Sequence, residues 1–112
     1  DVYYDIAICY FKIKDFNNTL NYLNFILENY PNSDIDSFNK REFGKIAAKC
    51  HLGIINCYLI LNNTNKIQFH LNLLTKFDDS SYVLDDSNNK LTFYNIAKEN
   101  IKLKESYKND LL

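Results

Sequence analysis

The chain has 112 residues, a formal net charge of −1 and 46% hydrophobic residues. That length allows one domain at most, and the near-zero charge without a basic run gives nucleic-acid binding little electrostatic support. The longest apolar run, Leu52 to Leu61, is interrupted by Asn56 and is too short to span a bilayer, and no secretory signal is visible.

Residues 3–31 carry the pattern of two amphipathic helices joined by a tight turn. The first helix is expected to have one apolar face, formed by Ile6, Cys9, Tyr10 and Ile13 at spacings of three and four. Asp15 is placed to cap the second helix, and Pro31 is placed to end it. The apolar stripe of this second helix is Phe16, Leu20, Leu23, Leu27 and Tyr30. Neither helix is long enough to be stable alone, so the two are predicted to form an antiparallel pair.

The same stretch resembles a tetratricopeptide repeat. The residues that carry the resemblance are Tyr3, Ile6, Ala7, Tyr10, Asp15, Phe16 and Pro31. Thr19, Leu23 and Ile26 depart from the pattern, which suggests a looser or wider contact between the helices. The resemblance implies an all-α fold of antiparallel helix pairs, an α-α superhelix with about five helices, and a function in binding other proteins.

A second helix pair is expected after a polar connector at residues 32–40. The periodicity predicts a third helix that starts at Ser37 or Asn39 and runs to about Leu61. Residues 62–65 form the turn to a fourth helix. Its inner side is predicted to carry Ile67, Leu71 and Leu74, with Phe77 near its end.

An internal repeat relates the two pairs. IAICYFKI at residues 6–13 aligns with IINCYLIL at residues 54–61, so that the offset from Cys9 to Cys57 is 57 − 9 = 48 residues. A tetratricopeptide repeat recurs at about 34 residues, so about 14 residues are inserted, in the connector and the front of the third helix. Asn63 stands where Asp15 stands in the first pair.

Residues 78–87 read as an acidic loop, which could tuck Tyr82 or Leu84 onto the helices. A last helix is predicted to begin near Ser87 and to cover residues 88–110. Its inner stripe is expected to be Leu91, Tyr94, Ala97 and Ile101, flanked by Phe93 and Ile96. The Lys and Glu residues between them are interpreted as a solvated face.

The second half of the chain also resembles the large tetratricopeptide subunit of the ciliary intraflagellar transport particle, the Polaris family. The segments that carry this resemblance are INCYLILNNTNKIQFHLNLL, DDSSYVLDDSNN and AKEN. Residues 32–46 depart from that family. The resemblance implies a cytoplasmic, cilium-associated component of a multi-subunit assembly.

Little in the sequence points to catalysis or to a metal. Cys9, Cys50 and Cys57 form an odd set without a framework spacing, so we expect free thiols in a hydrophobic core. Together with His51 and His70 they fit no common zinc pattern. The two histidines are isolated from each other in the sequence, and there is no Gly-rich phosphate loop. We therefore predict no catalytic residue, no metal and no cofactor.

The expected partner-binding surface is the concave side of the stacked first helices. The tetratricopeptide resemblance implies that its residues are Tyr4, Ile8, Phe11 and Lys12 in the first unit and, 48 residues later, Leu52, Asn56, Leu59 and Ile60 in the second. This mostly apolar face suits an amphipathic helix or peptide, or neighbouring repeats of the same chain. The Lys and Asn clamp that some family members use for a peptide carboxylate is missing, since Tyr4 and Ile8 hold those positions. The alternative is that these residues pack internally, against the last helix or flanking repeats.

The predicted organisation is a single helical domain. It divides into unit one (1–31), a connector (32–40), unit two (41–77), the acidic loop (78–87) and a last helix (88–110). Because the sequence lacks an initiator Met and starts within the first predicted helix, we expect a piece of a larger protein. The predicted function is a non-catalytic protein–protein interaction scaffold. The alternatives are an accessory domain of an enzyme whose catalytic part lies elsewhere, and helical-repeat RNA binding.

Overall fold

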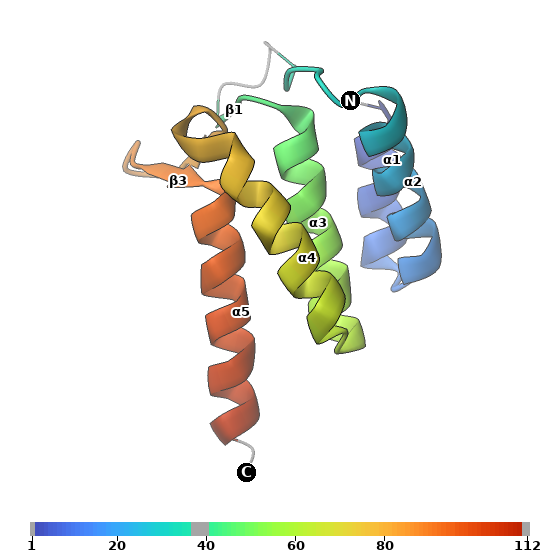
Figure 1. Ribbon diagram of the computed structural model, residues 1–112, viewed down its shortest axis with the longest axis vertical. Coiled ribbons are helices and arrows are strands. Elements are labelled where there is room, and N and C mark those ends of the chain that lie inside the picture. The colour runs from blue at the N-terminus through green and yellow to red at the C-terminus, as the bar shows by residue number, and fades with distance from the viewer. Residues whose placement is uncertain (1, 37–40, 111–112) are drawn as a thin grey trace.

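The computed structural model describes residues 2–36 and 41–110, and within them the chain is mostly helical (Figure 1). The helices are α1 (Val2–Lys12), α2 (Phe16–Asn29), α3 (Ile46–Leu61), α4 (Thr64–Leu74), the 3-10 helix η1 (Thr75–Ser80) and α5 (Phe93–Asp110). Three short strands accompany them, β1 (Glu42–Phe43), β2 (Tyr82–Leu84) and β3 (Lys90–Thr92). The predicted all-α fold is confirmed.

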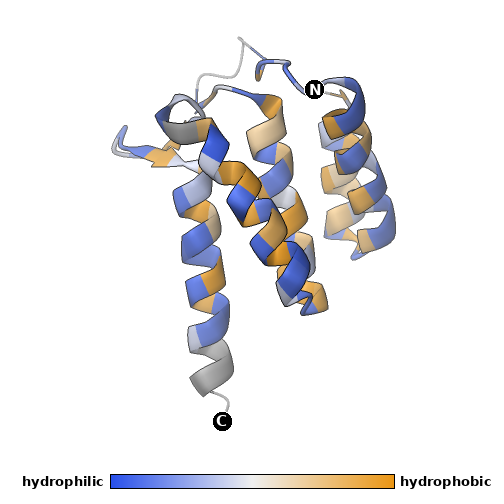
Figure 2. Cartoon of the chain, viewed as in Figure 1, coloured by the Kyte–Doolittle hydropathy of each residue, from blue (hydrophilic) through white to orange (hydrophobic). Residues whose placement is uncertain are grey.

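The chain forms two helix pairs, unit one (α1 and α2) and unit two (α3 and α4), followed by α5. In the view of Figure 1, α2 lies in front of α1 and α4 lies in front of α3. The helix α5 lies beside unit two, on the side away from unit one. In Figure 2 orange hydrophobic residues alternate with blue hydrophilic residues along each helix, as expected when one stripe is buried and the other faces water.

The two units turn from first to second helix in the same way. Lys14 and Asn62, which are 48 residues apart, both adopt a left-handed conformation, with φ of 65° and 60°. The next residue caps the second helix in each unit. The Asp15 carboxylate accepts a hydrogen bond from the Asn18 backbone N–H at 3.2 Å. The Asn63 side chain accepts one from the Lys66 N–H at 3.1 Å. The internal repeat is therefore present in the backbone as well as in the sequence.

The hydrophobic core lies in two clusters. One is centred on α2 and its contacts with α1 and α3, and its buried residues are Ala7, Leu23, Ile26, Ile46, Cys50 and Ile54. The other joins α3, α4 and α5 through Ala48, Ile55, Leu74, Phe93 and Ala97. Gly53 lets α3 approach α2 closely, because a Cβ built there would lie 3.0 Å from Leu23 Cδ1.

A three-stranded antiparallel sheet, ordered β1-β2-β3, closes one end of the helices. Glu42 pairs with Val83, and Val83 pairs with Leu91. Gly44 follows β1 with φ of +102°, and a Cβ there would lie 2.4 Å from Ser81 Oγ, so only glycine fits.

The sheet corrects two predicted boundaries. Ser37 and Asn39, the predicted start of the third helix, lie outside the described residues, but Glu42–Phe43 is a strand and α3 begins only at Ile46. The last helix begins at Phe93 instead of near Ser87, because residues 90–92 pair with β2.

The same pairing corrects three side-chain predictions. Leu91 is a strand residue with 41% of its surface exposed, so it is not part of the inner stripe of α5. Phe93, expected beside that stripe, is a fully buried core residue. Within the predicted acidic loop it is Val83, rather than Tyr82 or Leu84, that packs on the second cluster.

Candidate partner-binding groove

A small groove of about 70 Å³ lies where α1 and α3 pass over α2. Three side chains of α1 line it, Tyr4, Ile8 and Phe11. The other lining residues are Thr19 and Leu23 of α2 and Leu52, Gly53 and Asn56 of α3. The structure thus brings together Tyr4, Ile8, Phe11, Leu52 and Asn56, which the sequence placed on one surface.

The floor of the groove is apolar and its one hydroxyl is satisfied. Leu23 is fully buried, and the Thr19 Oγ1 donates a hydrogen bond to the Asp15 carbonyl at 2.9 Å. Because this hydroxyl is already engaged within the helix, the floor offers van der Waals contact rather than a polar anchor. Thr19, Leu23 and Gly53 were not predicted as part of this surface, because only the stacking of the two units brings them into it.

The charge next to Tyr4 is already neutralised within the chain. Lys49 Nζ lies 4.0 Å above the centre of the Tyr4 ring and 2.9 Å from the Glu42 carboxylate, and both partners of this ion pair are mostly buried. Burial also raises the pKa of the Tyr4 hydroxyl above its ordinary value, so the phenol stays neutral. This rim is therefore aromatic and uncharged in character.

The opposite rim of the groove, formed by α3, is hydrogen-bonded to α5. Asn100 donates a side-chain hydrogen bond to Asn56 Oδ1 at 3.0 Å, which links α5 to the lip of the groove. Near the other end, Phe11 and Phe16 make an edge-to-face contact with ring centres 5.6 Å apart. Both contacts hold lining residues in one orientation. Asn100 carried no signal in the sequence, because its partner is 44 residues away.

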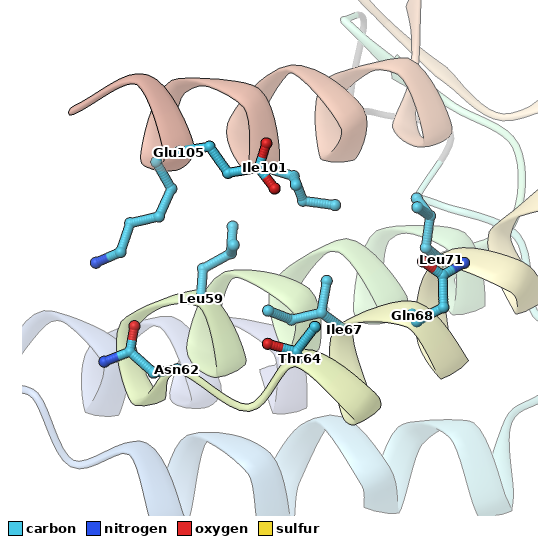
Figure 3. Close-up of a pocket in the computed structure, with 9 residues that line it drawn as sticks. Leu59, Asn62, Thr64, Ile67, Gln68, Leu71, Ile101 and Glu105 are labelled. Atoms are coloured by element: carbon cyan, nitrogen blue, oxygen red, sulfur yellow. The ribbon is translucent and has the colours of Figure 1, made fainter. Parts of the chain in front are cut away.

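The remaining predicted residues lie elsewhere. Lys12 and Ile60, which are equivalent positions in the two units, are both exposed outside the groove. Leu59 lines a second hollow, a cleft of about 300 Å³ between α3, α4 and α5. Figure 3 shows Leu59, Ile67 and Ile101 converging on this cleft.

The cleft is the unit-two counterpart of the groove. Phe11, Thr19 and Leu23 of the groove correspond, 48 residues later, to Leu59, Ile67 and Leu71 of the cleft. The two helices of one unit form two walls of each hollow, and the helix that follows the unit in sequence forms the third. This helix is α3 for the groove and α5 for the cleft. The cleft has the larger volume, and its lining includes Lys104 and Glu105.

The two histidines, expected to be isolated, are in contact. His51 Nδ1 lies 3.0 Å from His70 Nδ1, and both rings are buried between α3 and α4. Burial lowers the pKa of His51 to about 4, with a smaller contribution from His70. Burial lowers the pKa of His70 as well. Both are therefore neutral at pH 7, and one ring donates its N–H to the other.

The cysteines divide by position. Cys50 and Cys57 are buried as predicted, and burial raises their pKa to about 12 and about 11. Cys9 is exposed, so its assignment to the core is wrong. The reason is that α1, at the outer edge of the described helices, packs mainly on α2, whereas α3 packs on α2, α4 and α5. Within the described ranges, no three His, Cys, Asp or Glu side chains come together as a metal site would require.

Comparison with protein families, with curated proteins and with solved structures finds no match to this chain. No helix in the part of the chain that the structure describes is both long and apolar enough to cross a membrane.

Proposed function

We propose that this chain is a non-catalytic protein-binding scaffold built from helix pairs of the tetratricopeptide kind, and that its partner binds along the α1–α3 groove. One observation carries the proposal: equivalent helices of two repeated units line successive hollows with apolar side chains. Such a repeated surface suits an extended or helical partner, which can place one side chain in each hollow.

The chemistry of the groove favours an amphipathic helix over a charged ligand. Tyr4, Ile8, Phe11 and Leu52 offer apolar surface, and the Asn56 amide supplies polar atoms at the rim. Lys49 already pairs with Glu42. A carboxylate or a nucleic-acid phosphate would therefore find little complementary charge here, whereas a helix with a Leu or Ile stripe would bury apolar surface against it.

The cellular setting is proposed from sequence resemblance. The likeness of residues 55–74, 78–89 and 97–100 to the Polaris family supports a place in a cytoplasmic multi-subunit assembly, with the ciliary intraflagellar transport particle as the candidate. Purification of the particle from ciliated cells, followed by detection of this chain in the same fractions, would test that assignment.

The groove itself is tested by quantitative capture of partners with matched isoleucine variants. Ile8→Asp places a charge in the groove, and Ile60→Asp places the same charge on an exposed position of α3 outside it. We expect Ile8→Asp to lower partner recovery roughly tenfold or more, the effect of losing about 1.4 kcal/mol, while Ile60→Asp leaves it unchanged. Circular dichroism must show the same helicity in both variants. Equal recovery by both would exclude the groove.

A further inference from the structure

Unit one carries an aromatic hollow that shares no lining residue with the α1–α3 groove. The hollow measures about 180 Å³ and is lined by Tyr3 of α1 and by Asn21, Tyr22 and Phe25 of α2. Its exposed lining is entirely apolar. The Tyr3 and Phe25 rings meet at an angle of 54° with their centres 5.0 Å apart. Tyr22 stacks one face of its ring on Tyr10, so only its other face can meet a ligand.

The equivalent positions of unit two show what fills this space there. Tyr3 and Tyr22 correspond, 48 residues later, to His51 and His70. The two histidine rings touch each other, with centres 5.2 Å apart, and Phe77 of η1 lies 6.0 Å from His51. The contacts that close the space therefore come from α4 and η1, the elements that follow α3. The repeat thus gives no reason to expect a further unit of the chain over the aromatic hollow.

Lysine side chains cover other aromatic rings of this chain, but not those on the α2 side of the hollow. In the described part of the chain, a lysine ammonium group lies 4.0 to 4.8 Å from the ring centre of three tyrosines, Tyr4, Tyr82 and Tyr94. No such contact involves Tyr22 or Phe25 there. Because the face of an aromatic ring attracts a cation, these two rings keep that capacity for a ligand.

The charge beside the hollow is negative. Glu28 follows Phe25 by three residues, which places both on the same side of α2, and Glu28 is exposed. It takes part in none of the ion pairs formed among the described residues. The lysines of unit one are Lys12 and Lys14, at the turn between α1 and α2. A cationic ligand is therefore favoured over an anionic one at this site.

We propose that the aromatic hollow binds the trimethylammonium group of a trimethylated lysine in a partner protein. A quaternary ammonium is attracted by the ring faces and has no N–H group that would need an acceptor in an apolar lining. An unmethylated lysine would give up hydrogen bonds to water there without replacing them. A choline lipid headgroup is disfavoured, because its phosphate would lie near Glu28 with no lysine beside it. This site does not depend on partner binding in the groove.

The test titrates the whole chain with three small probes that differ only at the end of the side chain. They are N-acetyl-trimethyllysine methylamide, its unmethylated lysine form, and a neutral isostere in which a tert-butyl group replaces the trimethylammonium group. The backbone amide signals of Tyr22 and Phe25 in nitrogen–proton correlation NMR spectra report binding. We expect the trimethylated probe to bind about two- to fivefold more tightly than the neutral isostere, the gain of a cation at exposed rings, and more tightly than the lysine form.

Matched variants locate the site. Tyr22→Leu and, at a more exposed position, Phe25→Leu should remove the preference for the cation, whereas Tyr22→Phe should keep it. Tyr94→Leu on α5 and Ile8→Asp in the groove should leave it unchanged, so failure of the hollow and failure of the groove are distinguishable. Equal affinity for the trimethylated probe and the isostere would overturn the proposal, as would a preference that survives both leucine variants of α2. Tighter binding of phosphocholine would overturn it in favour of a lipid headgroup.

Discussion

Acidification should destabilise the fold through the buried His51–His70 contact. One neutral imidazole donates its Nδ1–H to the other across the 3.0 Å between their Nδ1 atoms, and burial disfavours the charged imidazolium form of either ring. The folded chain therefore resists protonation, as the low pKa of His51 shows. Because the unfolded chain binds the proton more readily, stability is complete above the ordinary pKa of 6.5 and falls as the pH drops toward 4.

The size of the effect follows from the two pKa values of His51. Each tenfold difference in proton affinity corresponds to about 1.4 kcal/mol, so a pKa of about 4 against 6.5 limits the loss to about 3 kcal/mol below pH 4. About 2 kcal/mol of this is lost between pH 7.5 and pH 5. The pKa of the Asp85 carboxyl is lowered by hydrogen bonds from the Asn89 and Ser87 backbone N–H groups, so this carboxylate stays ionised in that window.

Urea unfolding at pH 7.5 and at pH 5.0 measures this loss directly. The matched control replaces both rings, with His51→Leu and His70→Leu together, since exchanging both partners for apolar groups leaves no unpaired donor. We expect the wild-type chain to lose about 2 kcal/mol between the two pH values and the double variant to lose almost none. Equal wild-type stability at both pH values, or an undiminished loss in the double variant, would refute the reasoning.

Three further predictions concern packing and exposure. Ala7→Leu should cost roughly 1–3 kcal/mol by overpacking the fully buried contact between α1 and α2, which thermal unfolding will show; an unchanged midpoint would mean that the crossing is placed wrongly. Gly44→Ala should cost more than about 1 kcal/mol, because φ of +102° and the Ser81 hydroxyl leave no room for a Cβ, and urea unfolding checks this against wild type. In the native chain a thiol reagent should label Cys9 quickly and the buried Cys50 and Cys57 only after denaturation; rapid labelling of all three would contradict the burial described.

The features that sequence predicted well are those set by local chemistry. Asp15 and Asn63 cap the second helices as their positions indicated, and α2 ends just before Pro31. The offset between Cys9 and Cys57 correctly related the two units, because each turn is determined by a few adjacent residues. The shared surface of Ile8 and Leu52 followed from that offset.

The features that sequence missed depend on distant partners. The helical periodicity predicted a third helix that starts near Ser37. Nothing in the sequence around Glu42 indicates that this residue pairs with Val83 in a sheet. The contact of His51 with His70 spans 19 residues, from one helix of unit two to the other. The offset of 48 residues held a signal in this case, because it aligns His70 with Tyr22 and so places an aromatic ring at the same position of both units; in the structure Tyr22 stacks on Tyr10 and His70 stacks on Tyr58.

The most direct test of the scaffold proposal is photo-crosslinking from inside the groove. A benzoyl-phenylalanine replaces Phe11, which lines the groove, or Ile60, which is exposed on α3 outside it. On irradiation in cells, position 11 should form a discrete adduct with a partner protein, an adduct that Ile8→Asp abolishes, and position 60 should not. Equal adducts from both positions, or an adduct at position 11 that survives Ile8→Asp, would contradict partner binding in the α1–α3 groove.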